Sequence, residues 1–97
     1  MEENIYITRL FDYYGCLLTD KQCQYFSDYY LENLSLSEIA ENYDVSRNAV
    51  FKQLKEAENK LKYYEEKLKL SENGIKIEKL LEKINDKRIK EQIEKLI

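Results

Sequence analysis

Apolar residues recur at helical spacing along almost the whole chain. Over residues 2–17 they form two neighbouring stripes, Tyr6, Leu10, Tyr13 and Leu17 beside Ile7, Phe11, Tyr14 and Leu18. A face this wide predicts a helix that is buried against more than one neighbour. The crowded aromatic rings would also suit a base-stacking platform. The strict periodicity favours core packing.

A second helix is predicted from residue 20 to about residue 31. Thr19 and Gln22 form a T-x-x-Q capping box at its start. Asn33 suits the left-handed conformation that closes a helix. Cys23 lies on the apolar face of this helix, so we expect it to be a small core residue.

Residues 36–54 predict a helix, a tight turn and a second helix. An S-x-x-E capping box at Ser35 and Glu38 precedes the first apolar face, and Ser46 suits the N-cap of the second helix. Ala40 is small, as required where two helices cross closely. This pattern is typical of a helix-turn-helix, whose second helix can lie in a DNA major groove. An ordinary helical pair in a core would show the same apolar spacing.

The helix that begins at Arg47 is predicted to continue far beyond the motif. A heptad seam runs through Val50, Leu54, Ala57, Leu61, Tyr64 and Leu68. Because no helix breaker precedes residues 71–74, this helix should reach residue 70, a length of about 36 Å. We expect its far end to be covered by the C-terminal helices or by a second copy of the chain.

Residues 75–85 and 87–97 predict two short amphipathic helices that are separated by an Asn85-Asp86 turn. They should form a hairpin that packs on the long helix or in a dimer, and the alternative is a frayed tail. The residues expected to form the arm or dimer packing are Leu61, Tyr64, Leu68, Ile77, Leu81 and Ile84. The predicted fold is therefore all-α, a helix-turn-helix bundle over residues 1–70 with a long recognition helix extended into a C-terminal helical arm over residues 71–97.

Composition supports helices throughout and adds a charge asymmetry. The 97 residues include no proline and two glycines, and the formal net charge is −3. Residues 1–45 carry two basic and nine acidic side chains, a net of −7, whereas residues 46–97 carry fourteen and ten, a net of +4. An acidic protein with one basic half fits selective nucleic-acid binding rather than binding by bulk charge.

The candidate DNA-binding residues lie on the outward side of the helix that starts after Ser46. Arg47 can bind guanine and Asn48 can bind adenine by paired hydrogen bonds. Phe51 could meet a thymine methyl group, or it could pack on the first helix or on a partner. Lys55 is placed for phosphate contact. The full set of candidates is Ser46, Arg47, Asn48, Phe51, Lys52 and Lys55.

Several functional classes are not supported by the sequence. The chain has no histidine, no Gly-rich phosphate loop and no nucleophile motif, so we expect neither an enzyme nor a cofactor. Cys16 and Cys23 lack a C-x-x-C pattern, which argues against a zinc site, and they are expected to be reduced thiols in the cytoplasm. No run of 18 apolar residues predicts a membrane span.

Several blocks together resemble the YlxM family of small bacterial helix-turn-helix proteins. They are residues 10–14 (LFDYY), 18–22 (LTDKQ), 29–30 (YY), 36–41 (LSEIAE), 45–50 (VSRNAV) and 64–68 (YEEKL). The family's motif is in turn similar to region 4 of bacterial sigma factors. The resemblance implies an all-helical dimer with a link to the signal recognition particle pathway. Asp44 stands where many such motifs have glycine, and Asp tolerates a left-handed turn better than most residues.

Two functions follow as hypotheses. The first is a cytoplasmic, homodimeric, DNA-binding regulatory protein. The second is an adaptor that contacts the protein or the RNA of the signal recognition particle, with the motif serving only as a scaffold. A purely structural dimer would show neither activity.

Overall fold

The computed structural model describes residues 2–97, and side chains from Asn4 onward. It contains six α-helices in this part of the chain, α1 (Glu2–Tyr14), α2 (Asp20–Phe26), α3 (Leu36–Tyr43), α4 (Arg47–Leu68), α5 (Leu70–Leu81) and α6 (Lys87–Glu94). A 3₁₀ turn, Gly15–Leu17, follows α1, and a π-helical turn, Ser27–Leu31, extends α2. No strand occurs within the described residues, so the predicted all-α fold is confirmed.

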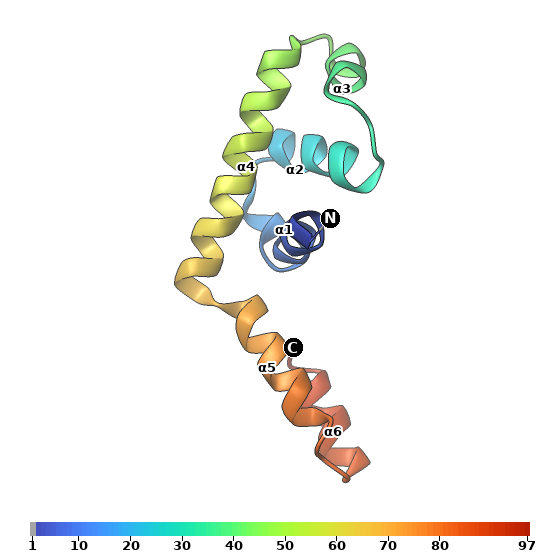
Figure 1. The fold of residues 1–97 in the computed structure, drawn as a ribbon, viewed down its shortest axis with the longest axis vertical. Coiled ribbons are helices and arrows are strands. Elements are labelled where there is room, and N and C mark those ends of the chain that lie inside the picture. The colour runs from blue at the N-terminus through green and yellow to red at the C-terminus, as the bar shows by residue number, and fades with distance from the viewer. Residues whose placement is uncertain (1) are drawn as a thin grey trace.

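Helix α4 is the element on which the fold is built. Helices α1, α2 and α3 all pack against it, and α5 and α6 extend beyond its C-terminal end (Figure 1). The molecule is therefore elongated, with dimensions of 54 × 25 × 23 Å.

The core lies where the first three helices meet the inward side of α4. Phe11 of α1 stacks on Phe26 of α2 with ring centroids 4.4 Å apart. Tyr14 is buried and Cys23 packs against the same core. The core-packing interpretation is thus confirmed for these residues. The largest buried side chains are Tyr14, Phe26, Ile7, Leu10, Ile39, Leu61 and Val50.

Local hydrogen bonds set the boundaries of α2 and α3 as the sequence predicted. The Thr19 hydroxyl accepts a hydrogen bond from the Gln22 amide at 3.2 Å, and the Ser35 hydroxyl accepts one from the Glu38 amide at 3.1 Å. Both capping boxes are complete, since the Gln22 and Glu38 side chains accept from the cap amides in return. Asn33 has a φ of 58°, the expected left-handed conformation.

The long helix ends within two residues of the predicted end, but the predicted helix breaker is wrong. Helix α4 ends at Leu68, and Lys69, with a φ of 55°, is a left-handed joint that leads directly into α5. The segment 71–74, expected to break the helix, lies inside α5 instead. Gly74 is buried there because Tyr13 packs over it, and a Cβ atom at this position would lie 2.5 Å from the Tyr13 hydroxyl.

The cover over the far part of α4 also differs from expectation. Within the single chain, helix α1 rather than a C-terminal helix covers α4 as far as Glu65. Leu61 is completely buried by this contact. Helix α5 packs on α1 and on the end of α4, and it does not lie along α4.

The predicted wide buried face of the first helix is confirmed only in part. Ile7, Leu10 and Tyr14 are buried, because α1 contacts α4 and α5 together. Tyr6 and Leu17 are 44% and 49% exposed, so the prediction that they are buried is wrong.

Helices α5 and α6 form a hairpin at the C-terminal end. The Asp86 carboxylate accepts hydrogen bonds from the amides of Arg88 and Ile89, which confirms the predicted N-cap. Leu81 of α5 and Ile97, beyond α6, line one hollow together with Tyr13 of α1. Helix α6 therefore returns beside α5 toward the N-terminal helices (Figure 1).

Candidate nucleic-acid interface

The turn between α3 and α4 depends on a single left-handed residue. Asp44 has φ 54° and ψ 48°, so aspartate does adopt the conformation for which many such turns use glycine. The Val45 amide then donates to the Ala40 carbonyl at 3.0 Å. The Ser46 hydroxyl accepts from the Ala49 amide at 3.0 Å and so starts α4. These bonds hold the first turn of α4 at the surface.

The outward side of the first turns of α4 carries the predicted candidates. Ser46, Arg47, Asn48, Phe51, Lys52 and Lys55 are all exposed. Val50 and Leu54 point into the core. Since residues three and four apart share a helix face, Arg47, Phe51 and Lys55 follow one line, and Asn48 and Lys52 lie beside it. The structure therefore brings the whole set onto one continuous surface.

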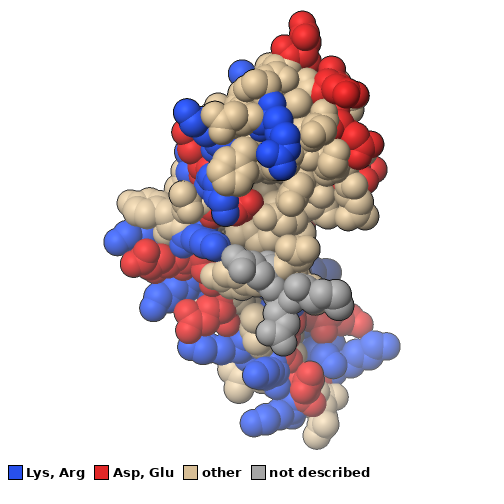
Figure 2. Space-filling model, turned by 45° about the horizontal axis from the view of Figure 1, so that its top comes forward, with Lys and Arg blue, Asp and Glu red and all other residues tan. Residues whose placement is uncertain are grey.

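Charge is divided across this end of the molecule. Lys and Arg side chains gather on the α4 side, whereas Asp and Glu side chains gather on the α3 side (Figure 2). Among the latter, Glu38 accepts a hydrogen bond from the Ser35 amide at 3.0 Å, and this bond lowers the pKa of the Glu38 carboxyl. A polyanion can thus approach α4 but is repelled from the exposed side of α3.

Arg47, Phe51 and Lys55 form what we call the basic line of α4. Lys55, at its end, also contacts the ring of Phe51. Its ammonium lies 5.8 Å from the centroid of the Phe51 ring and 3.6 Å from a carboxylate oxygen of Glu58. The Lys55 side chain nevertheless remains 57% exposed. Lys55 can therefore contact a phosphate while its ammonium group stays close to the Phe51 ring.

An aromatic hollow of about 420 Å³ lies next to this line. It is lined by Asn4, Tyr29, Tyr30, Leu36, Phe51, Leu54, Lys55 and Glu58. The apolar pattern did not predict this hollow, although Tyr29 and Tyr30 are adjacent in the chain. Their adjacency was a usable signal, because consecutive helical residues point about 100° apart and cannot share one buried face.

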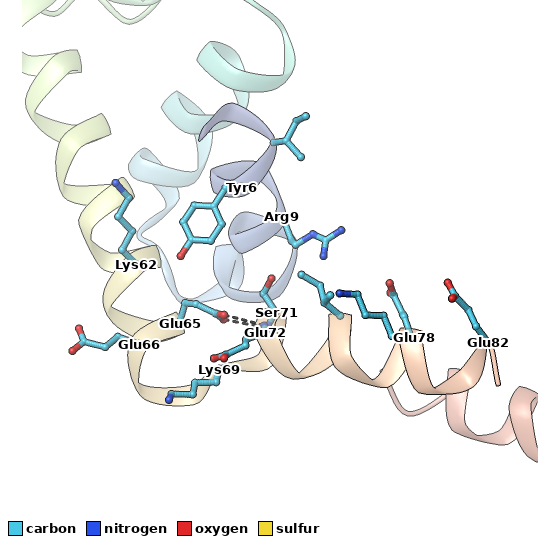
Figure 3. A pocket seen from close by; sticks show the side chains of 13 residues that line it. Tyr6, Arg9, Lys62, Glu65, Glu66, Lys69, Ser71, Glu72, Glu78 and Glu82 are labelled. Carbon is cyan, nitrogen blue, oxygen red and sulfur yellow. Dashed lines mark hydrogen bonds between the residues drawn. The ribbon is translucent and has the colours of Figure 1, made fainter. Parts of the chain in front are cut away.

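A polar cluster lies where α1, α4 and α5 meet, apart from the basic line and the aromatic hollow. The Tyr14 hydroxyl donates to Glu65 Oε1 at 2.6 Å. The amides of Ser71 and Glu72 donate to the same carboxylate at 3.1 and 3.0 Å (Figure 3). The Leu70 amide donates to the Tyr14 hydroxyl at 3.0 Å. Burial, followed by the bond to Glu65, raises the pKa of Tyr14. Glu65 and Tyr14 together therefore cap the first turn of α5.

The cluster borders a junction hollow of about 1040 Å³. Side chains of both signs line it, including Arg9, Lys62, Lys69 and Glu66 (Figure 3). Tyr6 and Ile75 add partly exposed apolar surface. No group of three or more potential metal-ligating side chains occurs among the residues that the structure describes.

The predicted arm and dimer residues fall into different environments. Leu61 and Leu81 are buried within one chain, and Tyr64 packs against the core. Ile77 and Ile84 are half-buried. Leu68 is 51% exposed at the end of α4. Of these six residues, Leu68 is therefore the one with the largest surface left for a second chain.

Comparison with known proteins gives a consistent result. A family model described as "Putative helix-turn-helix protein, YlxM / p13 like" matches residues 1–97. The UPF0122 protein of Caldanaerobacter subterraneus subsp. tengcongensis is 47% identical over 87 residues, which span 89% of this chain and 74% of that protein. The UPF0122 protein of Thermoanaerobacter sp. X514 is 46% identical over 83 residues, 86% of this chain and 71% of that protein.

A relative from Bacillus velezensis, also named a UPF0122 protein, is 52% identical over 66 residues, which span 68% of this chain and 60% of that protein. None of the helices described in residues 2–97 has both the length and the apolar character needed to cross a membrane.

Proposed function

The chain belongs to the YlxM/p13-like helix-turn-helix family, and we propose that it is a DNA-binding regulatory protein of the sigma region 4-like type. The observation that carries this proposal is the exposed start of α4, where Arg47 and Asn48 follow the left-handed turn and the Ser46 cap. In helix-turn-helix proteins this end of the second helix contacts base edges. The protein would act in the cytoplasm.

Each candidate side chain has a distinct role in the proposed complex. Arg47 donates two hydrogen bonds to guanine O6 and N7, and Asn48 pairs with adenine N6 and N7. Lys52 and Lys55 contact phosphates and fix the register of the helix. The first amides of α4 have no acceptor within the helix, and they add partial positive charge at the same place.

A duplex selected from a random pool tests the proposal, with affinity measured at low and moderate salt. Arg47→Ala should lower affinity about 5- to 150-fold if Arg47 binds a guanine. Lys87→Ala is the matched control, because it removes one positive charge from an exposed position at the start of α6, away from the first turns of α4. Affinity for the selected duplex no greater than non-specific affinity, or equal effects of the two variants, would refute the proposal.

We further propose that two copies of the chain associate around the joint between α4 and α5. Leu68, Leu70 and Ile75 leave apolar surface exposed there, next to the junction hollow with its charges of both signs. A surface with both signs can be complementary to itself across a two-fold axis. The dimer would set the spacing between two DNA half-sites.

Light scattering at micromolar concentration tests the dimer. Leu68→Glu should give a monomer with unchanged helix content. Leu31→Glu is the control, since Leu31 is similarly exposed, at 53% against 51%, but lies at the end of α2's π-turn. A wild-type monomer would contradict this part of the proposal.

One observation favours a second candidate function, an adaptor of the signal recognition particle. The exposed acidic side chains of the α3 side would repel DNA but would attract a basic protein surface (Figure 2). Pull-down with the purified GTPase and RNA of the particle tests this function. Retention of the GTPase by Arg47→Ala protein, but not by a variant with Glu41 changed to Lys, would support the adaptor over the DNA reader.

A further inference from the structure

The aromatic hollow presents rings to solvent beside the basic line of α4. Phe51 is 43% exposed and Tyr29 is 37% exposed, although both are large aromatic side chains. Tyr29 contacts Tyr30 edge-on with centroids 5.0 Å apart, and Tyr30 lies 4.5 Å from the buried ring of Phe26. The exposed surface is thus the outer end of an aromatic cluster that begins in the core.

Contacts on the core side of the hollow hold its lining residues in place. The Tyr30 hydroxyl donates to a Glu58 carboxylate oxygen at 2.7 Å, which joins α2's π-turn to α4. Leu54 is buried beneath the hollow. A volume of about 420 Å³ lies within the range of about 300–1,000 Å³ that is usual for small-molecule pockets.

The position of the hollow relative to the basic residues suggests its ligand. Phe51 lies one helical turn after Arg47 and one turn before Lys55. A nucleic-acid strand that contacts both cations must therefore pass Phe51. We propose that the aromatic hollow receives one unpaired base of that strand, with the base stacked on Phe51 and the neighbouring phosphate on Lys55.

The chemistry of the lining favours a base over an apolar protein side chain. Aromatic faces bind bases of any sequence by stacking, and nearby cations bind the phosphates that accompany them. The Asn4 amide at the edge of the hollow can both donate to and accept from the edge of a base. A base inside a duplex is already stacked on both faces, so the ligand must be a bulged, looped or single-stranded nucleotide.

This inference rests on the proposed function, because α4 must first hold the strand. The base site adds a preference for an unpaired nucleotide, which a protein that only contacts the major groove would lack. The protein should bind a duplex with one unpaired nucleotide more tightly than the same duplex fully paired, by about 5- to 150-fold.

The test uses two DNA hairpins of one sequence, with and without a single bulged 2-aminopurine, and the same pair in RNA. Wild-type protein should prefer the bulged form and change the fluorescence of the bulged base. Phe51→Ala should lower affinity for the bulged form more than affinity for the paired form, and so abolish the preference. Phe51→Trp, which keeps an aromatic face, should retain the preference, and so should Tyr63→Ala, the matched control on α4, whose ring is 56% exposed away from the hollow.

The outcomes separate the two proposals. Equal affinity for bulged and paired hairpins overturns the base site but leaves the proposed function standing. An equal loss on both hairpins in Phe51→Ala also overturns it and assigns Phe51 to the groove. A change of mass in light scattering with Phe51→Ala assigns the hollow to a second copy, and this too overturns the base site. If Arg47→Ala has no effect on either hairpin, the proposed function itself fails.

Discussion

Replacing Glu65 by alanine should destabilise the protein more than any other change to an acidic side chain of α4. Its carboxylate accepts three hydrogen bonds, from the Tyr14 hydroxyl and from the amides of Ser71 and Glu72. The alanine variant removes the acceptor from all three donors. The first turn of α5 then loses the carboxylate that holds it beside α1 and α4.

The magnitude follows from the environment of each donor. The bonds to the Tyr14 hydroxyl and the Ser71 amide are buried, whereas the bond to the Glu72 amide is partly buried at the edge of the junction hollow. A buried donor without a partner costs about 1–3 kcal/mol. Water can reach the Glu72 amide, so we assign the cost to the first two donors alone, about 2–6 kcal/mol in total.

Urea denaturation followed by circular dichroism measures this loss, and the melting temperature should fall by about 10–50 °C in a domain of this size. Glu66→Ala removes a neighbouring exposed carboxylate and should stay within about 0.5 kcal/mol of wild type. Amide hydrogen exchange at Ser71 and Glu72 should accelerate in Glu65→Ala but not in Glu66→Ala. Equal stability of the two variants, or unchanged exchange at these amides, would refute the reasoning.

Three further predictions concern local geometry and pH. Gly74→Ala should destabilise the protein by about 1–3 kcal/mol through overpacking, because the new Cβ would lie 2.5 Å from the Tyr13 hydroxyl. In a Tyr13→Phe background the same change should leave thermal stability unchanged or raise it, since alanine favours a helix over glycine by about 1 kcal/mol. Asp44→Gly should raise the unfolding free energy by about 0.5–1 kcal/mol because the φ of 54° no longer strains a side chain, and no change or a decrease in urea midpoint would contradict this. The bond from the Ser35 amide lowers the pKa of the Glu38 carboxyl from 4.5. The stability that ionised Glu38 contributes is therefore present above pH 4.5 and is lost as the pH falls through the lowered pKa. Glu38→Gln should reduce this acid-dependent loss of stability in a series of denaturation curves, and an unchanged pH dependence would exclude the contribution.

The sequence predicted best where local hydrogen bonding decides the structure. Both capping boxes, the Asp86 cap and the left-handed Asn33 are formed as predicted, because each depends on residues within four positions. The helix-turn-helix was found for the same reason. The exposed side of α4 follows from helical periodicity once Val50 and Leu54 are assigned to the core.

The long-range contacts could not be read from the same patterns. Nothing near Lys69 predicts a break, since the bend depends on Glu65 and on Tyr14, a residue far away in the sequence. Gly74 was expected to break the helix, but its lack of a side chain instead leaves the space that the Tyr13 ring occupies. The aromatic hollow was missed because it needs the π-turn of α2 to lie beside α4, and periodicity within one helix does not specify which neighbour it will meet.

The central place of α4 also has a consequence for the synthesis of the chain. Helices α1, α2 and α3 precede α4 and all pack on it, so none of them has its complete core until Leu61 has left the ribosome. At about 5–20 residues per second, roughly 1–3 seconds separate the emergence of Arg47 from that of Leu61. We expect a fragment of residues 1–45 to be largely unfolded by circular dichroism. Its net charge of −7 would keep such nascent chains apart during this delay.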